Sequence, residues 1–292
     1  MTISDHAGGV SGENVLDLDR LEQMLPALHS QYVSARPFPH VVLENFLVPE
    51  TAERAAREFP AVNDDSWINY FHLNERKSAN PKVETWQPTP QAIAAALTSP
   101  EFVSFLGRLT GIDNLFADPS MEGGGLHQSL AGGYLNVHAD FTVHPLHVDW
   151  RRRINLLLYL NTDWHEEYGG GLELWSRDAK RCETKILPVC NRAVIFTTDA
   201  DSFHGHPDPM RCPEGVVRRS LALYYFTVED HPMVRSTEYR ARPGDGAKSA
   251  LIYLDKQAVR LYDRAKRRLG ISDRRTDDIL KRLAKIARRR KR

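Results

Sequence analysis

Hydrophobic and polar residues follow different periods along the chain, and the first part has the period of a helix. Between Asn14 and Ser34 apolar residues recur every three or four positions, at Val15, Leu18, Leu21, Leu25 and Leu28. This spacing predicts a helix with one buried face. Residues 37–47, PFPHVVLENFL, predict a short strand bounded by prolines. A second helix is expected from Pro49 to Pro60, because proline suits the first turn of a helix and stops its continuation.

The following segment, residues 61–89, is polar with scattered aromatic residues. We expect a long, lid-like loop there, since long loops in enzymes often cover or bind the substrate. Two short helices are predicted next, at 90–98 and 100–110.

Closely spaced strands are predicted from Gly123 onward. They read GGGLHQSL, GGYLNVHADF, INLLLYLN, GGLELWS, ETKILPV, RAVIFTT and RRSLALYYFTV. Gly, Asp, Asn and Pro separate them, and this density indicates an antiparallel barrel or sandwich rather than alternating strands and helices. Helical periodicity returns after Ala247, with one helix predicted from Ser249 to Gly270 and a second after Thr276.

The composition is that of an ordinary soluble globular protein, with 41% hydrophobic and 26% charged residues in 292. The N-terminal segment MTISDHAGGVSGENV has neither the basic nor the apolar region of a signal peptide, and apolar runs such as INLLLYL are too short to cross a membrane. Cys182, Cys190 and Cys212 show no paired spacing, which argues against a disulfide framework and a zinc knuckle. We therefore expect a cytoplasmic protein.

A net charge of +1 hides an uneven distribution. Residues 249–292 hold 16 Lys and Arg against 5 Asp, so this segment carries +11 and the rest of the chain −10. A basic tail that ends in RRRKR suits contact with an acidic partner, whether protein, nucleic acid or lipid surface. The apolar stripe of Ile279, Leu283 and Ile286 favours a helix that packs on the body, and the role of the final RRRKR stays open.

Two potential metal ligands lie in the strand GGYLNVHAD, residues 132–140. Side chains two positions apart on a strand point to the same face, so His138 and Asp140 are expected side by side. An imidazole and a carboxylate form two corners of the 2-His-1-carboxylate triad of non-haem Fe(II) oxygenases. His204, in SFHGHP after the strand RAVIFTT, is the candidate for the third ligand.

A buried cation is expected on the strand 218–226. Alternation puts Arg218 and Ser220 on one face and Arg219 on the other. An inward guanidinium needs a buried anion, and a carboxylate of a ligand matches its fork geometry, with Ser220 able to add a hydrogen bond. We therefore expect Arg218 to bind an anionic cosubstrate.

In this order the motifs resemble those of the 2-oxoglutarate/Fe(II)-dependent dioxygenases, specifically the prolyl 4-hydroxylase-like branch. The resemblance covers roughly residues 120–230 and rests on HxD, then YLN-x-DW with GG-x-L, then FHGHP, then RRSLALYYF, with a weaker similarity in 37–47. It implies that iron binds to His138, Asp140 and His204. It also implies that Arg218 binds the distal carboxylate of 2-oxoglutarate, that Tyr159 assists this contact, and that Gln128 lies near the cosubstrate.

The resemblance implies a mainly β fold with flanking α-helices, built on a double-stranded β-helix (jelly-roll) core. On this basis the chain divides into a disordered N-terminus (1–13), a helical support with the lid-like loop (14–119), the catalytic core (120–232) and a helical extension with the basic tail (233–292).

The implied reaction is hydroxylation of an unactivated C–H bond with Fe(II), 2-oxoglutarate and O2, which releases succinate and CO2; ascorbate is a candidate stimulant. Related halogenases replace the metal carboxylate with a small residue, so Asp140 favours hydroxylation. The family admits prolyl residues, free amino acids, and small or carrier-bound metabolites as substrates, and the sequence does not choose among them.

A second HxD motif, His147-Val148-Asp149, is the rival to the first pair. It follows Pro145 and precedes three arginines, so it falls in a connection rather than on a glycine-flanked strand, and we favour His138 and Asp140. Two further histidines, His144 and His206, are expected to support the site or lie in loops.

Another class of function also fits the motifs. The chain could be a non-catalytic β-barrel binding module that keeps a relic metal site and docks through its basic tail. A cupin-like metalloprotein with other chemistry is a third reading, and it would not need Arg218.

Overall fold

The computed structural model describes residues 15–269 of the chain. A curled sheet of thirteen strands dominates this part, and all of its strand pairs are antiparallel. A mainly β fold with flanking helices, as the sequence predicts, is therefore confirmed. The disorder expected for 1–13, the helix expected after Thr276 and the terminal RRRKR lie outside the described residues.

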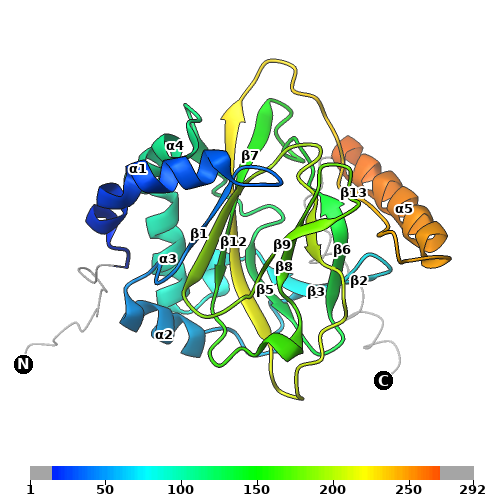
Figure 1. Ribbon diagram of the computed structural model, residues 1–292, viewed down its shortest axis with the longest axis horizontal. Coiled ribbons are helices and arrows are strands. Elements are labelled where there is room, and N and C mark those ends of the chain that lie inside the picture. Colours follow the sequence, from blue (N-terminus) through cyan, green and yellow to red (C-terminus); the bar gives the residue numbers. More distant parts are fainter. Residues whose placement is uncertain (1–14, 270–292) are drawn as a thin grey trace, which may run out of the picture.

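Helices cover one side of the sheet (Figure 1). They are α1 (Leu18–Ser34), α2 (Pro49–Arg57), the short η1 (Val83–Thr85), α3 (Pro88–Thr98) and α4 (Pro100–Thr110). α1 begins at Leu18 because the Asp17 carboxylate caps it, accepting from the Arg20 backbone N–H at 2.9 Å. Proline occupies the first turn of α2, α3 and α4, where a helix has no use for a backbone donor.

The strands that the sequence predicts are present, and five further strands (β2, β3, β4, β11 and β13) join them in the sheet. In chain order they are β1 (His40–Leu43), β2 (Ile68–His72), β3 (Glu75–Asn80), β4 (Phe116–Ala117), β5 (Gly125–Ser129), β6 (Tyr134–Ala139), β7 (Trp150–Tyr159), β8 (Leu172–Trp175), β9 (Cys182–Ile186), β10 (Arg192–Thr197), β11 (His204–His206), β12 (Arg218–Val228) and β13 (Glu238–Tyr239), with the helical turn η2 (Glu166–Tyr168) between β7 and β8. Across the sheet the order is β1-β10-β7-β12-β5-β3-β6-β11-β8-β9. β2 pairs with β3, β4 with β12 and β13 with β6.

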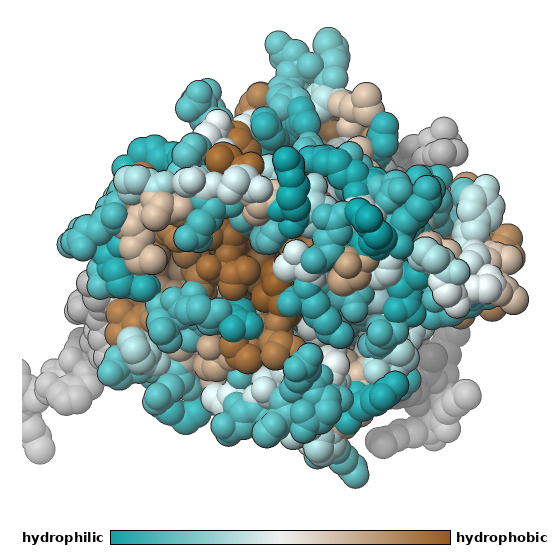
Figure 2. All heavy atoms as spheres, viewed as in Figure 1, coloured by the Kyte–Doolittle hydropathy of each residue, from teal (hydrophilic) through white to brown (hydrophobic). Residues whose placement is uncertain are grey.

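The two faces of the sheet have different roles. The outer face of β7 and β12 contributes Leu156, Leu158, Leu221 and Leu223 to a core shared with the helices. The inner face holds a smaller apolar cluster that joins Phe196 to residues of β8 and β9, so the curl brings the two ends of the strand order together. Figure 2 shows hydrophobic residues gathered in the middle of this view with hydrophilic residues around them.

The lid-like loop expected at 61–89 is wrong for much of that segment. β2 and β3 form a hairpin with a two-residue connection, and β3 pairs with both β5 and β6. It therefore belongs to the sheet and is no loop above it. The loop was predicted because β3 (ERKSAN) is polar except for Ala79 and shows no hydrophobic alternation.

One more helix, α5 (Lys248–Leu269), lies on the far side of the sheet from the other helices (Figure 1). Its Asp255 carboxylate accepts hydrogen bonds from His72 Nδ1 at 2.8 Å and from Asn74 Nδ2, which ties the helix to the β2–β3 hairpin. Within residues 15–269, no helix combines the length and the apolar character that a membrane span requires.

Candidate active site

Three side chains from two neighbouring strands converge on the inner face of the curl. His138 on β6 is the register partner of His204 on β11, and their ring centroids lie 4.4 Å apart. Asp140 follows the end of β6, and its two carboxylate oxygens lie 3.5 Å from His138 Nε2 and 3.5 Å from His204 Nε2. One ligand atom from each side chain can be chosen so that all three lie within 4.8 Å of one another. This is the spacing that a single metal ion requires.

Both histidines are held in the form that can bind a metal. Nδ1 of His138 donates to the Asn136 carbonyl at 2.9 Å, and Nδ1 of His204 donates to the Ser202 carbonyl at 2.9 Å. A carbonyl only accepts, so the proton sits on Nδ1 and Nε2 keeps its lone pair. Burial and the neighbouring His138 lower the pKa of His204 to about 4, which leaves its imidazole neutral at pH 7.

The Asp140 carboxylate is fixed from behind by two donors on β7. Arg152 Nη2 donates to Asp140 Oδ2 at 2.9 Å, and Asn155 Nδ2 donates to the same oxygen at 2.8 Å. Arg152 Nε also donates to Asn155 Oδ1 at 2.8 Å, which closes a three-residue network. Burial alone would raise the pKa of Asp140, but Arg152 and the two histidines bring it well below its usual value, so the carboxylate is ionised.

Strict alternation does not predict this network, because it would place Arg152 and Asn155 on opposite faces of the strand. The register of β12 against β7 shifts between Tyr225 and Phe226, where the partners pass from Ile154 to Arg152. This β-bulge turns Arg152 to the face that Asn155 occupies. The guanidinium, in a side chain 1% exposed, lies 3.4 Å from the ring centroid of Tyr224 and 4.6 Å from that of Phe141.

A second buried arginine stands on the same face without a carboxylate. Arg218 Nε donates to the Gly170 carbonyl at 2.7 Å, and Nη2 donates to the Tyr159 hydroxyl at 3.3 Å. Gly170 has φ +68, and a Cβ there would lie 3.0 Å from Arg218 Cδ, so glycine is needed for this approach. Burial lowers the pKa of Arg218, and no acidic side chain of the described chain pairs with it. A buried guanidinium in this state calls for an anionic ligand.

The wall between this arginine and the triad contains nitrogens that lack partners. Ser220, as predicted, shares its face with Tyr159 and also pairs with His127 of β5. Nε2 of His127 and Nδ1 of His206 are buried with no hydrogen-bond partner. Burial together with the charges of Lys77 and Arg218 lowers the pKa of His127 to about 3. Burial and the same two charges lower the pKa of His206 well below its usual value. Neutral imidazoles of this kind can bond a bound ligand.

Gln128 does not lie near the proposed cosubstrate site, where the family resemblance led us to expect it. It pairs with Arg219 of β12 and Ser78 of β3, so it faces away from Arg218 and Ser220. Its Nε2 donates to the Val62 carbonyl at 3.1 Å on that outer side. The physical reason is the two-residue period of β5, which gives the inner position to His127 instead.

The β2–β3 hairpin adds an ion-pair chain to the inner face. His72 Nε2 lies 2.9 Å from Glu75 Oε1, and Lys77 Nζ lies 3.3 Å from Glu75 Oε2. Burial opposes ionisation of Glu75, but Lys77 and His72 lower its pKa to about 2. Burial would also lower the pKa of Lys77, yet Glu75 raises it, so both groups are charged. These residues were not predicted, because the polar pattern of their segment is typical of a loop.

The rival motif is not brought to the triad. His147 and Asp149 are exposed, and the His147 ring stacks on Trp150 with centroids 3.9 Å apart. His144 is fully buried beside Asp118, with 3.3 Å between Nε2 and Oδ2. Among the residues that the structure describes, the triad is the group of three or more His, Cys, Asp or Glu side chains with metal-site spacing.

Comparison with known proteins identifies the class of this fold and site. The profile of the 2OG-Fe(II) oxygenase superfamily matches residues 124–226, the segment that carries all three triad residues and Arg218. The expected resemblance to the 2OG-Fe(II) oxygenases is thereby confirmed over residues 124–226, and it supports an enzyme of the dioxygenase class. Fe(II) and 2-oxoglutarate are the metal and cosubstrate of this class. No curated protein matches the chain.

Solved structures with the same fold include prolyl hydroxylases from three organisms. A prolyl-4-hydroxylase from Pseudomonas putida has a TM-score of 0.51 at 17% identity, over 70% of this chain and 99% of that one. A Trichoplax adhaerens prolyl hydroxylase, in complex with a peptide fragment of a hypoxia inducible factor, has a TM-score of 0.52 at 19% identity, over 72% and 91%. A prolyl 4-hydroxylase from Phytophthora capsici has 0.50 at 19%, over 76% and 70%. At these identities the likeness establishes the jelly-roll fold alone.

Proposed function

We propose that this chain is an Fe(II)- and 2-oxoglutarate-dependent hydroxylase. In this proposal His138, Asp140 and His204 bind the iron, and Arg218 binds the distal carboxylate of 2-oxoglutarate with help from Tyr159. The observation that carries the proposal is Arg218 itself. It is a buried guanidinium without a carboxylate, on the same inner face as a set of three metal-type ligands.

The residues present fit both groups. Two neutral imidazoles and one carboxylate are the donor set that non-haem Fe(II) uses. 2-oxoglutarate carries two carboxylates, so one can meet Arg218 and the other can lie at the metal, which balances both charges. The partnerless nitrogens of His127 and His206 supply hydrogen-bonding groups along the way. A binding site for an apolar ligand would not leave such groups buried.

When bound, the iron and 2-oxoglutarate supply the oxidative chemistry, in which O2 and 2-oxoglutarate are consumed, succinate and CO2 are released, and a substrate C–H bond becomes C–OH. The chain's own residues orient the metal ligand Asp140 and the cosubstrate. Arg152 and Asn155 hold Asp140 Oδ2, which leaves Oδ1 as the freer oxygen for the metal. Arg218 and Tyr159 would hold the far carboxylate of the cosubstrate, which would orient its keto acid end toward the triad.

The proposal allows a broad class of substrates. Prolyl residues of a protein, free amino acids, and small or carrier-bound metabolites all agree with the proposal. Asp140 favours hydroxylation over halogenation because a carboxylate occupies the position that a halide would need. The cytoplasmic location and the role of the basic tail stay predictions.

Turnover without a substrate tests the proposal. The protein should convert 2-oxoglutarate to succinate in the presence of Fe(II), O2 and ascorbate, and nuclear magnetic resonance can follow both acids. His138→Ala and His204→Ala should abolish this conversion, because each removes a ligand. His147→Ala is the matched control and should keep it. If His147→Ala lost the activity while the other two variants kept it, the ligand assignment would be wrong.

The alternative, a non-catalytic binding module with a relic site, predicts a different result. Such a protein would neither retain iron through dialysis nor gain thermal stability with 2-oxoglutarate. The closed Asp140 network and the metal-ready tautomers of both histidines favour the enzyme, because a relic would not need to keep them.

A further inference from the structure

A pocket of about 550 Å³ is lined in part by residues of β13, the short strand that pairs with β6. Three separate parts of the chain form its walls. These are Ala200 in the connection after β10, residues 234–240 around β13, and Arg260 of α5. Its volume is in the range of small-molecule sites. The proposed reaction gives this pocket no role.

The pocket and the triad share a rim. Glu238 pairs with Ala139, the residue before Asp140, while Tyr239 pairs with His138 and turns to the inner face. Further along, the Thr142 backbone N–H donates to the Arg235 carbonyl at 3.1 Å, and the Arg235 N–H donates to Thr142 Oγ1 at 2.9 Å. The pocket wall therefore runs alongside the segment that carries two of the three ligands.

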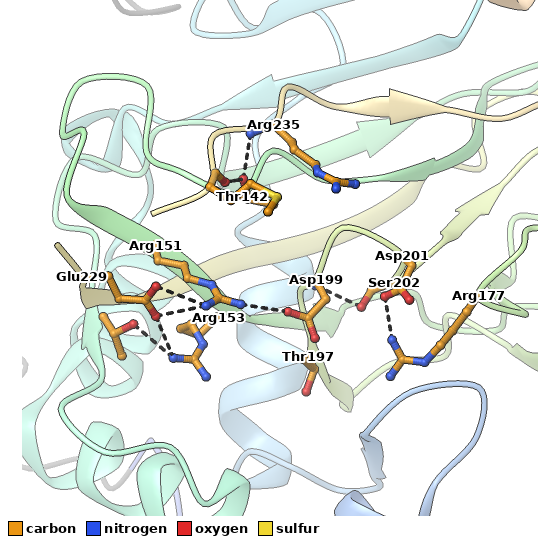
Figure 3. Close-up of polar contacts among 12 residues, drawn as sticks. Thr142, Arg151, Arg153, Arg177, Thr197, Asp199, Asp201, Ser202, Glu229 and Arg235 are labelled. Atoms are coloured by element: carbon orange, nitrogen blue, oxygen red, sulfur yellow. Dashed lines mark hydrogen bonds and ion pairs between the residues drawn. The ribbon is translucent and has the colours of Figure 1, made fainter. Parts of the chain in front are cut away.

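Most arginines at this end of the sheet are neutralised, but Arg235 is not (Figure 3). Arg151 pairs with Glu229 and Asp199, Arg153 pairs with Glu229, and Arg177 pairs with Asp201. The Arg235 side chain is exposed and has no polar partner in the described part of the chain. Its guanidinium is thus available to a ligand at the pocket.

The other arginines of the pocket share one carboxylate. Glu238 accepts from Lys256 Nζ at 2.7 Å and from Arg260 Nη2, and Arg240 Nε lies 3.3 Å from it. Three arginines and one glutamate line the pocket, so its walls carry an excess of two positive charges. A concave surface with unbalanced arginines concentrates anions, and the guanidinium fork fits oxyanions.

We propose that this pocket binds a phosphate group of the substrate, so that the enzyme acts on a phosphate ester. The inference rests on the proposed function, since it places the carbon to be hydroxylated at the triad and the phosphate in the pocket. A phosphate monoester carries close to two negative charges at pH 7 and three acceptor oxygens, which match the charge excess and the several donors. A single carboxylate would satisfy only half of that excess. Arg235 is the anchoring residue, and Arg260 makes α5 part of the substrate site.

Phenyl phosphate is a suitable probe, titrated calorimetrically under anaerobic conditions into the full chain loaded with Fe(II) and 2-oxoglutarate. We expect it to bind once per chain and to leave 2-oxoglutarate in place. Arg235→Gln and Arg260→Gln should each raise its dissociation constant roughly tenfold or more, because each removes a charged hydrogen bond. Arg57→Gln is the matched control, an exposed arginine on α2 that pairs only with Glu53, and it should change nothing.

Three outcomes would overturn the inference: benzoate binding as tightly as phenyl phosphate, displacement of 2-oxoglutarate by phenyl phosphate, or unchanged binding in Arg235→Gln. Arg235 is exposed and donates only through its backbone, so this variant is expected to fold normally. Succinate formation serves as the separate readout. If the protein makes succinate but does not bind phenyl phosphate, the phosphate assignment fails and the hydroxylase stands. If it binds phenyl phosphate in the pocket but makes no succinate, the anion site stands and the hydroxylase assignment fails.

Discussion

Arg218 and Arg219 are neighbours in sequence with opposite environments. Arg218 faces inward to Tyr159 and has no carboxylate. Arg219 faces the helices, where its Nη1 donates to the Ala56 carbonyl at 3.0 Å and its guanidinium lies 5.5 Å from the Phe59 ring centroid. The alternation of a strand is enough to predict this difference, and it makes the pair a natural control for each other.

We predict that Arg218→Met raises the KM for 2-oxoglutarate roughly tenfold to a hundredfold, because a charge-assisted contact to a buried carboxylate is lost. Arg219→Met should leave that KM unchanged and lower stability only. Steady-state assays of succinate formation measure both. Equal KM values for the two variants would remove Arg218 from the cosubstrate site.

At the scale of the element, β7 shows what a bulge adds to a strand. Its arginines stand side by side, yet Arg152 reaches Asp140 while Arg153 reaches Thr227 and Glu229 on the outer rim. The shift of register between Tyr225 and Phe226 produces this separation. The element therefore provides both inner packing and a fixed partner for the metal carboxylate.

Arg152→Met should weaken Fe(II) binding roughly tenfold to a hundredfold, since groups that orient a metal ligand contribute on that scale. Anaerobic competition with a coloured chelator measures the dissociation constant. Arg153→Met removes a charge from the adjacent position and should bind iron as tightly as the unaltered protein. If both variants lost iron equally, general loss of positive charge would be the cause rather than the clamp on Asp140.

The parts that the sequence predicted are those that depend on local periodicity. His138 and Asp140 lie two residues apart on one strand, and Arg218 and Tyr159 have the inward phase of theirs, so alternation alone places them. The inward position of Arg152 was not predicted, because a bulge breaks the alternation of β7. The strand β3 was not predicted, because its polar residues face a polar interior. The family resemblance predicted Gln128 near the cosubstrate, but the alternation of β5 points His127 inward and Gln128 outward.

At the scale of the whole molecule, the curl of the sheet brings distant segments to one inner face. β3, β5, β6, β7, β11 and β12 each contribute a polar side chain there, while the helices α1 to α4 pack against the outer face. α5 closes the opposite side through Asp255 and the β2–β3 hairpin. The architecture thus separates a packing face from a chemical face.

The central claim is that one metal ion and 2-oxoglutarate meet on this inner face. The direct test is an anaerobic calorimetric titration of 2-oxoglutarate into the full chain, with and without one equivalent of Fe(II). We predict one 2-oxoglutarate per chain, bound at least about tenfold more tightly when iron is present, because the keto acid end would bind to the metal while Arg218 would hold the other end. Binding that is equally tight without iron, or no binding in its presence, would contradict the account.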